Sequence, residues 1–369
     1  MPGLRHLIPA QASLRRLALT LPLTAAVFLA GCSTPPTQVS GPFNVVPAPD
    51  GSAPNYTAEQ KAAQQELVKM VALQDRLSKV SAPLLINNAD LCKTYARNLL
   101  GFTAQNKYSY PGVYADAAQA ALGYGEQMQV SGVLPGSGAA RAGLRKGDAL
   151  IAAEGKPLPT GPKAEGPFGA IVGPLASKSA SLNMTIARQG EQQQLAIPVT
   201  RACAFRVALG NADNVNAYSD GSRILLTRGM MAAAQNDENI GFVIAREMAH
   251  NILDHARTQR SAGTAGSIID SLGAVQPDTS MLTGAAGIKA MPPDLDAQAD
   301  TLAIYLLARA GYNIDNAASF WQRLSTQTPA SVANGYTALH PATSARLAAI
   351  NKAVADVKAK QAGKKPIKP

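Results

Sequence analysis

The stretch from 244 to 257, IAREMAHNILDHAR, contains residue types that can hydrolyse a peptide bond when a metal ion is bound beside them. A zinc-binding helix of this kind carries two imidazoles four residues apart and a glutamate that acts as general base. Glu247 and His250 stand at the positions of the base and the second imidazole. Arg246 stands where the first imidazole belongs. The stretch therefore predicts a helix of the zinc-hydrolase type that lacks one metal ligand.

Arg246 cannot replace an imidazole as a zinc ligand. Its guanidinium stays protonated, offers no lone pair and repels a dication. Without zinc, Glu247 has no metal-bound water whose lowered pKa makes hydrolysis possible. We therefore expect zinc, if it binds at all, to bind weakly, and we expect Arg246 to take the metal's place as a built-in cation.

Several regular elements must position these side chains. Residues 236–259 have helical periodicity with Asn236 as a candidate N-cap, and a second helix is predicted over 294–313, where Gly311 ends it. Two strands, one near 214–219 and one over 223–227, are joined by a turn at Asp220 and Gly221, and a further helix starts near Met230. The expected core face of the first helix consists of Ile240, Val243, Ile244, Met248 and Ile252.

These segments, in this order and together with LHPATSARL at 339–347, resemble the zinc metallopeptidase family of the CAAX prenyl protease and the HtpX heat-shock protease. The resemblance is to the soluble lipoprotein branch of that family and covers roughly residues 203–347. It implies that substrate lies along a strand pair like 215–227. It also implies that His250 is a zinc ligand, that Glu247 is the general base, and that Asp296 is the acidic ligand, four residues before Asp300.

The three histidines outside the N-terminal signal fall on positions that this resemblance marks. His255 matches a histidine commonly found later on the family's first helix, and His340 matches one near its active site. Two departures remain. Arg246 replaces the first histidine, and Asp296 stands where glutamate is usual and reaches one methylene less far. We expect Arg246 and Asp296 to pair.

Residues 129–158 resemble a PDZ domain of the bacterial protease type. The match comprises strands at 129–133 and 149–153, a short helix at 139–142, and turns at Gly143 and Gly147 with Asp148 bonding to backbone amides. The stretches SLNMTIARQG and QQLAIPVTR are predicted to close the sheet as a hairpin. The resemblance implies binding of an extended C-terminal peptide at a sheet edge, and the alternative is a domain used for packing or gating. The candidate carboxylate loop consists of Leu122, Gly123, Tyr124 and Gly125.

The N-terminus has the features of an export signal, with arginines before a short apolar run that ends in LAGC. This ending resembles the bacterial lipobox and implies that Cys32 is lipidated; the alternative is an uncleaved anchor helix. Ser33 favours the outer membrane, facing the periplasm. In that oxidising compartment, Cys92 and Cys203 are predicted to form a disulfide, with two buried thiols as the alternative.

The chain has 369 residues, 46% of them hydrophobic, and a formal net charge of +10. Its basic residues are scattered and accompany no nucleic-acid motif, so we do not expect nucleic-acid binding. We expect an α+β fold, in which a mostly helical metallopeptidase-like domain with a small edge sheet carries an inserted β-rich PDZ domain. The expected parts are a signal peptide (1–31), a tether (32–56), a helical part that begins with a helix from Thr57 to about Leu100 (57–107), the PDZ domain (108–201), the peptidase-like domain (202–350) and a basic disordered tail (351–369).

Three functions fit these observations. The first, which we expect, is a lipoprotein that binds unfolded or exposed envelope polypeptides in protein quality control, with weak or absent proteolysis. The second is an active zinc endopeptidase whose rebuilt site uses His250, Asp296 and His340. The third is a structural envelope protein that binds no peptide.

Overall fold

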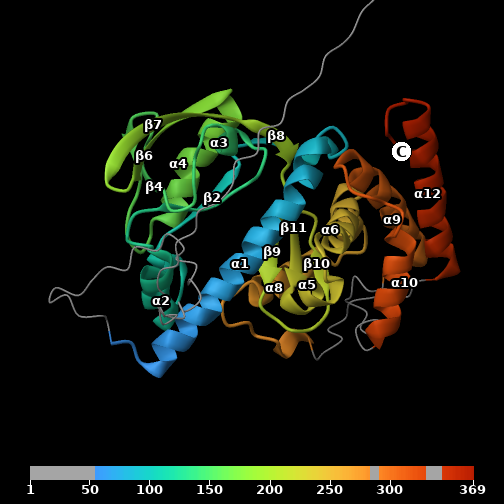
Figure 1. Ribbon diagram of the computed structural model, residues 1–369, viewed down its shortest axis with the longest axis horizontal. Helices are drawn as coiled ribbons and strands as arrows, with labels where there is room; N and C mark the ends of the chain where they lie inside the picture. The colour runs from blue at the N-terminus through green and yellow to red at the C-terminus, as the bar shows by residue number, and fades with distance from the viewer. Residues whose placement is uncertain (1–54, 283–290, 330–342) are drawn as a thin grey trace, which may run out of the picture. The chain divides into compact units, whose positions relative to one another are not determined.

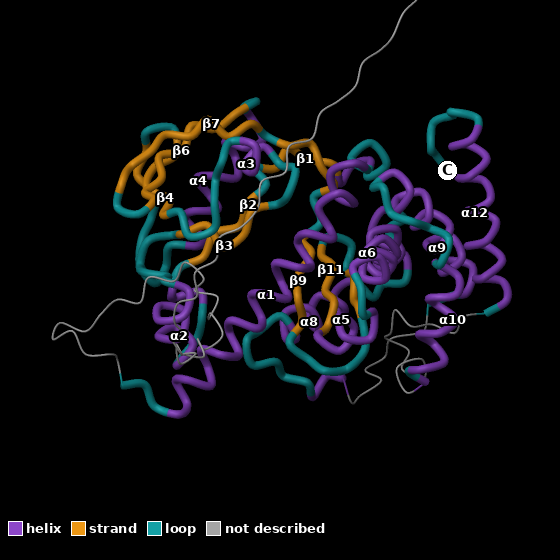
Figure 2. Tube along the Cα trace, viewed as in Figure 1, coloured by secondary structure: helices purple, strands orange, loops and turns teal. Residues whose placement is uncertain are grey.

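The computed structural model describes residues 55–282, 291–329 and 343–369. The predicted export signal, Cys32, nearly all of the tether and His340 lie outside these ranges. Within them the chain has the predicted α+β fold, in which helices and strands alternate up to residue 178, strands follow over 181–227, and helices follow from 228 onward (Figure 2). No helix in these ranges is long and apolar enough to cross a membrane.

A three-stranded sheet lies at the centre of the peptidase-like part. It consists of β9 (Arg206–Gly210), β10 (Ala217–Ser219) and β11 (Arg223–Thr227), in the order β10-β11-β9. β11 pairs with β9 in parallel and with β10 antiparallel. β10 is therefore an edge strand of the sheet in the described part of the chain.

Helix α6 (Asp237–Ile252) contacts both β10 and β11, and α8 (Ala262–Leu272) contacts the same two strands. The predicted N-cap of α6 is confirmed, since the Asn236 side chain accepts a hydrogen bond from the backbone N–H of Asn239 at 2.8 Å. All five residues of its predicted core face are buried. Burying each such side chain contributes about 1.5–3 kcal/mol, so the apolar stripe fixes how α6 is turned about its axis.

The other helices of this part pack around α6 and α9. They are α1 (Ala58–Asn87), α5 (Arg228–Ala234), α7 (His255–Thr258), α9 (Pro293–Arg309), α10 (Ala317–Gln327) and α12 (Ser344–Ala362). α9 runs beside α6 and α12 runs beside α9 (Figure 1). The predicted end of α9 is confirmed, because Gly311 follows its C-cap with φ +84°.

The residues between the two cysteines are rich in strands. One sheet has the order β2-β3-β4-β6-β7, and β5 pairs with β4. Its strands are β2 (Phe102–Gln105), β3 (Gln129–Val133), β4 (Ala149–Ala153), β5 (Lys156–Pro157), β6 (Ser181–Arg188) and β7 (Glu191–Pro198). Three helices accompany it: α2 (Val113–Leu122), α3 (Gly138–Arg141) and α4 (Glu165–Lys178).

The local predictions for this β-rich region hold well. β3 and β4 have the predicted bounds, and β6 and β7 form the predicted hairpin. Gly143 and Gly147 have φ of +79° and +89°, which only glycine adopts readily. Asp148 accepts a hydrogen bond from the backbone N–H of Arg145 at 2.7 Å, as expected for this turn.

Three predicted boundaries are corrected. The first helix ends at Asn87, not near Leu100, and β2 joins the sheet that the sequence placed after residue 108. The predicted disordered tail at 351–369 lies largely in α12, whose buried residues Ile350, Ala353 and Val357 pack in the main core. The sequence reading gave weight to the lysines and missed this apolar stripe.

A two-stranded ribbon connects the β-rich region to the rest, formed by β1 (Ala96–Leu99) and β8 (Thr200–Cys203). The structure joins Cys92 to Cys203 in a disulfide, with a Cα–Cα distance of 5.6 Å. Ala96 is the register partner of Cys203. The bridge therefore closes the base of the β-rich region beside the ribbon.

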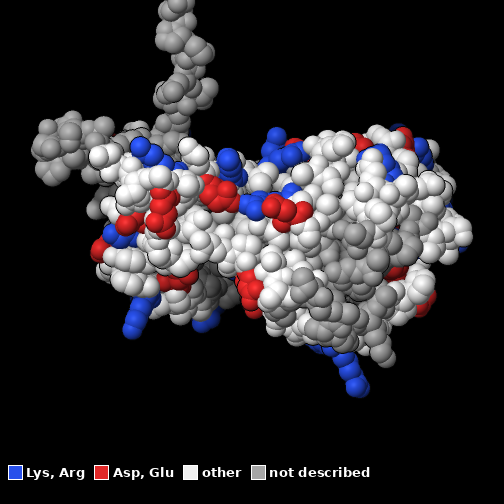
Figure 3. Space-filling model, turned by 90° about the horizontal axis from the view of Figure 1, so that it is seen from below, with Lys and Arg blue, Asp and Glu red and all other residues white. Residues whose placement is uncertain are grey.

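The basic residues do not gather on the face drawn in Figure 3, where they alternate with acidic ones. In the C-terminal segment, Lys358 and Lys360 pair with Asp315 and Asp356. This distribution agrees with the prediction that the net charge of +10 is spread over the chain.

Candidate functional site

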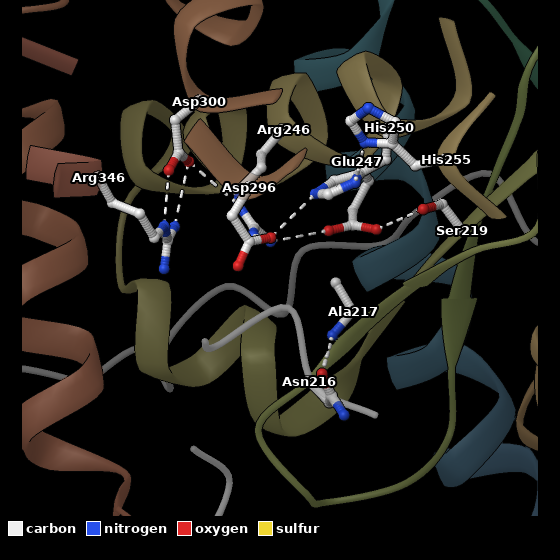
Figure 4. Close-up of polar contacts among 10 residues, drawn as sticks. All are labelled: Asn216, Ala217, Ser219, Arg246, Glu247, His250, His255, Asp296, Asp300 and Arg346. Carbon is white, nitrogen blue, oxygen red and sulfur yellow. Dashed lines mark hydrogen bonds and ion pairs between the residues drawn. The ribbon is translucent and has the colours of Figure 1, made fainter. Parts of the chain in front are cut away.

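Two helices bring five of the predicted site residues together in the core of the peptidase-like part. α6 supplies Arg246, Glu247 and His250, and α9 supplies Asp296 and Asp300. All five are buried, with Arg246 fully enclosed. Figure 4 shows their side chains pointing toward one another.

The guanidinium of Arg246 is shared between two carboxylates of α9. Nη2 donates to Oδ1 of Asp296 at 2.6 Å, and Nε donates to Oδ1 of Asp300 at 3.1 Å (Figure 4). The predicted pairing of Arg246 with Asp296 is confirmed. The sequence did not predict that Asp300 takes the other side of the same guanidinium.

A second arginine completes this buried cluster, and sequence reasoning missed it. Nε of Arg346, in the first turn of α12, donates to Oδ2 of Asp300 at 2.7 Å, and Nη2 donates to Oδ1 at 3.1 Å. Both arginines also lie over the ring of Trp321, with Cζ 5.4 Å from its centroid for Arg246 and 5.8 Å for Arg346. Arg346 lies in the motif LHPATSARL, which the sequence analysis had singled out. The motif alone did not indicate that Arg346 pairs with Asp300.

Arg246 stays charged in this environment. Burial lowers the pKa of a guanidinium, but the neighbouring carboxylates of Asp296 and Asp300 outweigh it, so the pKa of Arg246 lies above its ordinary value. The cation is therefore permanent, and its removal would leave the buried carboxylates of Asp296 and Asp300 with one cationic partner fewer.

Glu247 contacts a residue of the edge strand. Its Oε2 accepts a hydrogen bond from Oγ of Ser219 on β10 at 2.6 Å, and its Oε1 lies 3.5 Å from Nη1 of Arg246. Burial raises the pKa of Glu247, and the charge of Arg246 opposes this rise. The sequence placed a strand at 214–219 but gave no reason to select Ser219.

Asn251, next to His250 on α6, holds the hairpin of β10 and β11. Its Oδ1 accepts from the backbone N–H of Gly221 at 2.7 Å, and its Nδ2 donates to the carbonyl of Arg223 at 3.2 Å. Asn251 is completely buried. The position of the edge strand over Glu247 is thus fixed by the helix that carries Glu247.

The two described histidines of the site contact each other. Nδ1 of His250 lies 3.0 Å from Nδ1 of His255, and Nε2 of His250 lies 3.8 Å from Oδ1 of Asp296. His255 starts the separate helix α7, because Asp254 adopts a left-handed conformation and ends the first helical run. Burial lowers the pKa of His255.

This donor set does not fit a catalytic zinc ion. The oxygen of Asp296 that lies nearest His250 accepts a hydrogen bond from Arg246, so a guanidinium stands beside both remaining ligand positions. In the described ranges, no group of three His, Cys, Asp or Glu side chains is arranged to hold a metal ion. His340, the predicted additional ligand, lies outside them.

The predicted carboxylate loop at Leu122–Gly125 is corrected. The backbone amides of Gly123, Tyr124 and Gly125 donate to Gln119 O, Ala118 O and the Gln129 side chain. Tyr124 is buried in a cluster with Leu67 of α1. These amides are already used, so the segment packs α2 against α1 and presents no carboxylate site.

Comparison with known proteins supports part of this description. Residues 177–354 match the model of Peptidase family M48, so this part of the chain is a Peptidase family M48 domain, consistent with a zinc metallopeptidase family. No curated protein matches the chain.

The chain also matches a solved structure described as "Crystal Structure of the HtrA3 PDZ Domain Bound to a Phage-Derived Ligand (FGRWV)". The match has 15% sequence identity, covers 29% of this chain and 88% of the other, and has a TM-score of 0.22. A similarity this low carries no argument about the fold of the β-rich region.

Proposed function

We propose that this chain is an envelope lipoprotein that binds unfolded or exposed polypeptides through its Peptidase family M48 domain and does not cleave them efficiently. The observation that carries the proposal is the placement of the Arg246 guanidinium between Asp296 and Asp300. The Arg246 guanidinium already pairs with the carboxylate of Asp296, which stands at the acidic ligand position. Zinc would have to displace this cation in order to bind there.

The edge strand β10 supports polypeptide binding. Hydrogen bonds from Thr227 N to Asn216 O and from Asp220 N to Arg223 O flank its pairing with β11. Because hydrogen-bonded residues alternate along an antiparallel strand, the N–H and C=O groups of Ala217 and Ser219 point away from β11. The Ala217 N–H donates to Oδ1 of Asn216 at 2.8 Å, so an extended peptide that adds to this edge through main-chain hydrogen bonds would displace that amide oxygen.

The remaining parts of the proposal rest on sequence. The LAGC ending supports a lipid anchor on Cys32, and Ser33 favours the outer membrane, facing the periplasm. The β-rich region contains the turn and strand pattern of a PDZ domain, which we propose as a second peptide-binding module. Lipid labelling that persists in a Cys32→Ser variant would contradict the anchor.

Zinc content and proteolysis, measured on one sample, test the proposal. The chain without its signal and lipid is incubated with zinc, freed of unbound metal, and analysed for metal and for cleavage of an unfolded protein. We expect substoichiometric zinc, little cleavage and saturable binding of the unfolded protein. Stoichiometric zinc with proteolysis that Glu247→Gln abolishes would show an active peptidase instead, and absence of binding would favour a purely structural role.

An Ala217→Pro variant tests the binding edge. Proline removes the N–H of Ala217, which points away from β11 and donates to Oδ1 of Asn216 at 2.8 Å, and its ring obstructs an added strand. We expect binding of an unfolded peptide to weaken about tenfold, the loss that corresponds to one or two main-chain hydrogen bonds. Ser222→Ala, on the same hairpin, is the control and should bind as wild type does.

A further inference from the structure

We infer that Ser219 is a positioning residue that closes Glu247 to water, so that the site carries a second block to hydrolysis independent of Arg246. This inference rests on the proposed function, because it explains how a bound polypeptide stays uncut. Its basis is the hydrogen bond of 2.6 Å from Oγ of Ser219 to Oε2 of Glu247.

The geometry identifies which oxygen is blocked. Oε1 of Glu247 faces Arg246, whereas Oε2 faces the edge strand β10 (Figure 4). A general base must contact the water that attacks the peptide, either directly or at hydrogen-bond distance. Arg246 lies beside Oε1, so Oε2 is the oxygen that faces a peptide on β10, and the Ser219 hydroxyl already donates to it.

The hairpin holds this hydroxyl in place. Asn251 fixes both Gly221 and Arg223 to α6, so Ser219 cannot move away with its strand. Rotation of the Ser219 side chain could break the bond, but it would leave a buried carboxylate oxygen without its donor, which is unfavourable. The closed arrangement is therefore the stable one in the absence of metal.

The inference has a consequence for restoring activity. Arg246→His returns the first imidazole, but the Ser219 hydroxyl still donates to Oε2 of Glu247 and competes with water for it. Full recovery of hydrolysis then requires Ser219→Ala as well. Ser219→Thr keeps the hydroxyl and should keep the block.

The first test is chemical modification of Glu247 in the full soluble chain with its native Arg246. The chain is treated with a water-soluble carbodiimide and glycine ethyl ester, and labelling of Glu247 is followed by peptide mass spectrometry. We expect Ser219→Ala to be labelled at least about tenfold faster than wild type, which corresponds to loss of one hydrogen bond. Ser219→Thr should be labelled at Glu247 at the same rate as wild type. The control is Ser222→Ala, which removes a hydroxyl that contacts Asp220 and not Glu247, and it should also be labelled at the wild-type rate. Equal labelling of wild type and Ser219→Ala would overturn the inference.

The second test separates positioning from a merely structural role. Amide hydrogen exchange at 217–219 should be the same in wild type and Ser219→Ala, because Asn251 holds the hairpin. Faster exchange throughout β10 in Ser219→Ala would show that Ser219 only fastens the strand, and the inference would fail.

Kinetics of the metal-loaded variants complete the test. In the Arg246→His background, Ser219→Ala should raise kcat about tenfold and leave KM within about twofold. An unchanged kcat at equal zinc content would count against the inference. The proposed function fails on a different result, which is stoichiometric zinc and proteolysis in the wild-type chain, so the two failures are distinguishable.

Discussion

Arg246 lies over the indole ring of Trp321, with its Cζ 5.4 Å from the ring centroid. Trp321 is the only tryptophan in the sequence and is buried beside the candidate site. Its fluorescence therefore reports on whatever occupies the position of the Arg246 side chain.

This relationship gives a direct assay for metal binding. Arg246→His removes the cation over the ring and restores the pair of imidazoles, so added zinc should change Trp321 emission in a saturable way with one ion bound per chain. Wild type should show no such change. A zinc response of equal size and midpoint in wild type would mean that Arg246 does not prevent metal binding.

Arg246→Met should destabilise the fold by about 3–5 kcal/mol, because it leaves buried Asp296 and Asp300 with one partner fewer. Urea unfolding followed by circular dichroism measures the loss. Arg76→Met is the matched control, since Arg76 pairs with Asp237 in a partly exposed ion pair at 2.7 Å that should contribute less than about 1 kcal/mol. Similar losses of unfolding free energy in both variants would show that the buried ion pairs of Arg246 stabilise the fold no more than the partly exposed pair does.

Replacing both Cys92 and Cys203 by alanine should lower the free energy of unfolding by about 4–5 kcal/mol in the chain-entropy model, since the bridge spans 111 residues. Denaturation of the double variant and of the oxidised wild type, compared in the absence of reductant, measures this difference. Wild type treated with reductant under unfolding conditions should approach the double variant. A difference below about 1 kcal/mol would show that the bridge reduces the conformational entropy of the unfolded chain only slightly.

Asp220, in the turn between β10 and β11, should make stability depend on pH. Burial raises the pKa of Asp220, but hydrogen bonds from Ser222 and Arg223 outweigh it and hold the pKa below its ordinary value of 3.8. The folded state thus binds the proton less readily than the unfolded state, so Asp220 contributes stability above pH 3.8 that is lost as pH falls through the lowered pKa.

Thermal unfolding of wild type and Asp220→Asn across acidic pH measures this contribution. At neutral pH the variant should melt at a lower temperature than wild type, and the gap should narrow below pH 3.8. Asp315→Asn, which alters an exposed pair with Lys358, is the control. A gap that stays constant with pH would mean that ionisation of Asp220 does not stabilise the turn.

Local signals in the sequence were sufficient for the elements that carry the site. The Asn236 cap and the apolar spacing predicted α6, and Gly311 predicted the end of α9. The family resemblance placed Arg246 and Asp296 at one metal site, and this placement predicted that the two side chains pair. These features depend on residues that are neighbours in the sequence, or on a family motif that specifies which residues meet at the site.

The missed features depend on contacts between residues far apart in the chain. Ser219 and Glu247 meet because Asn251 ties a hairpin to a helix, and Arg346 reaches Asp300 because α12 packs along α9. β2 was assigned to the wrong part because its four residues carry little periodicity, and only pairing with β3 places it. No local pattern encodes such partners.

Ion pairs run from Arg346 through Asp300 and Arg246 to Asp296 and join three helices. The positive charges in this cluster belong to side chains of the protein itself. A metalloprotein must acquire its ion and loses its centre when the ion is scarce or chelated. Here the centre is complete as soon as the helices meet. We therefore expect the folding of this part of the chain not to depend on a supply of metal ions.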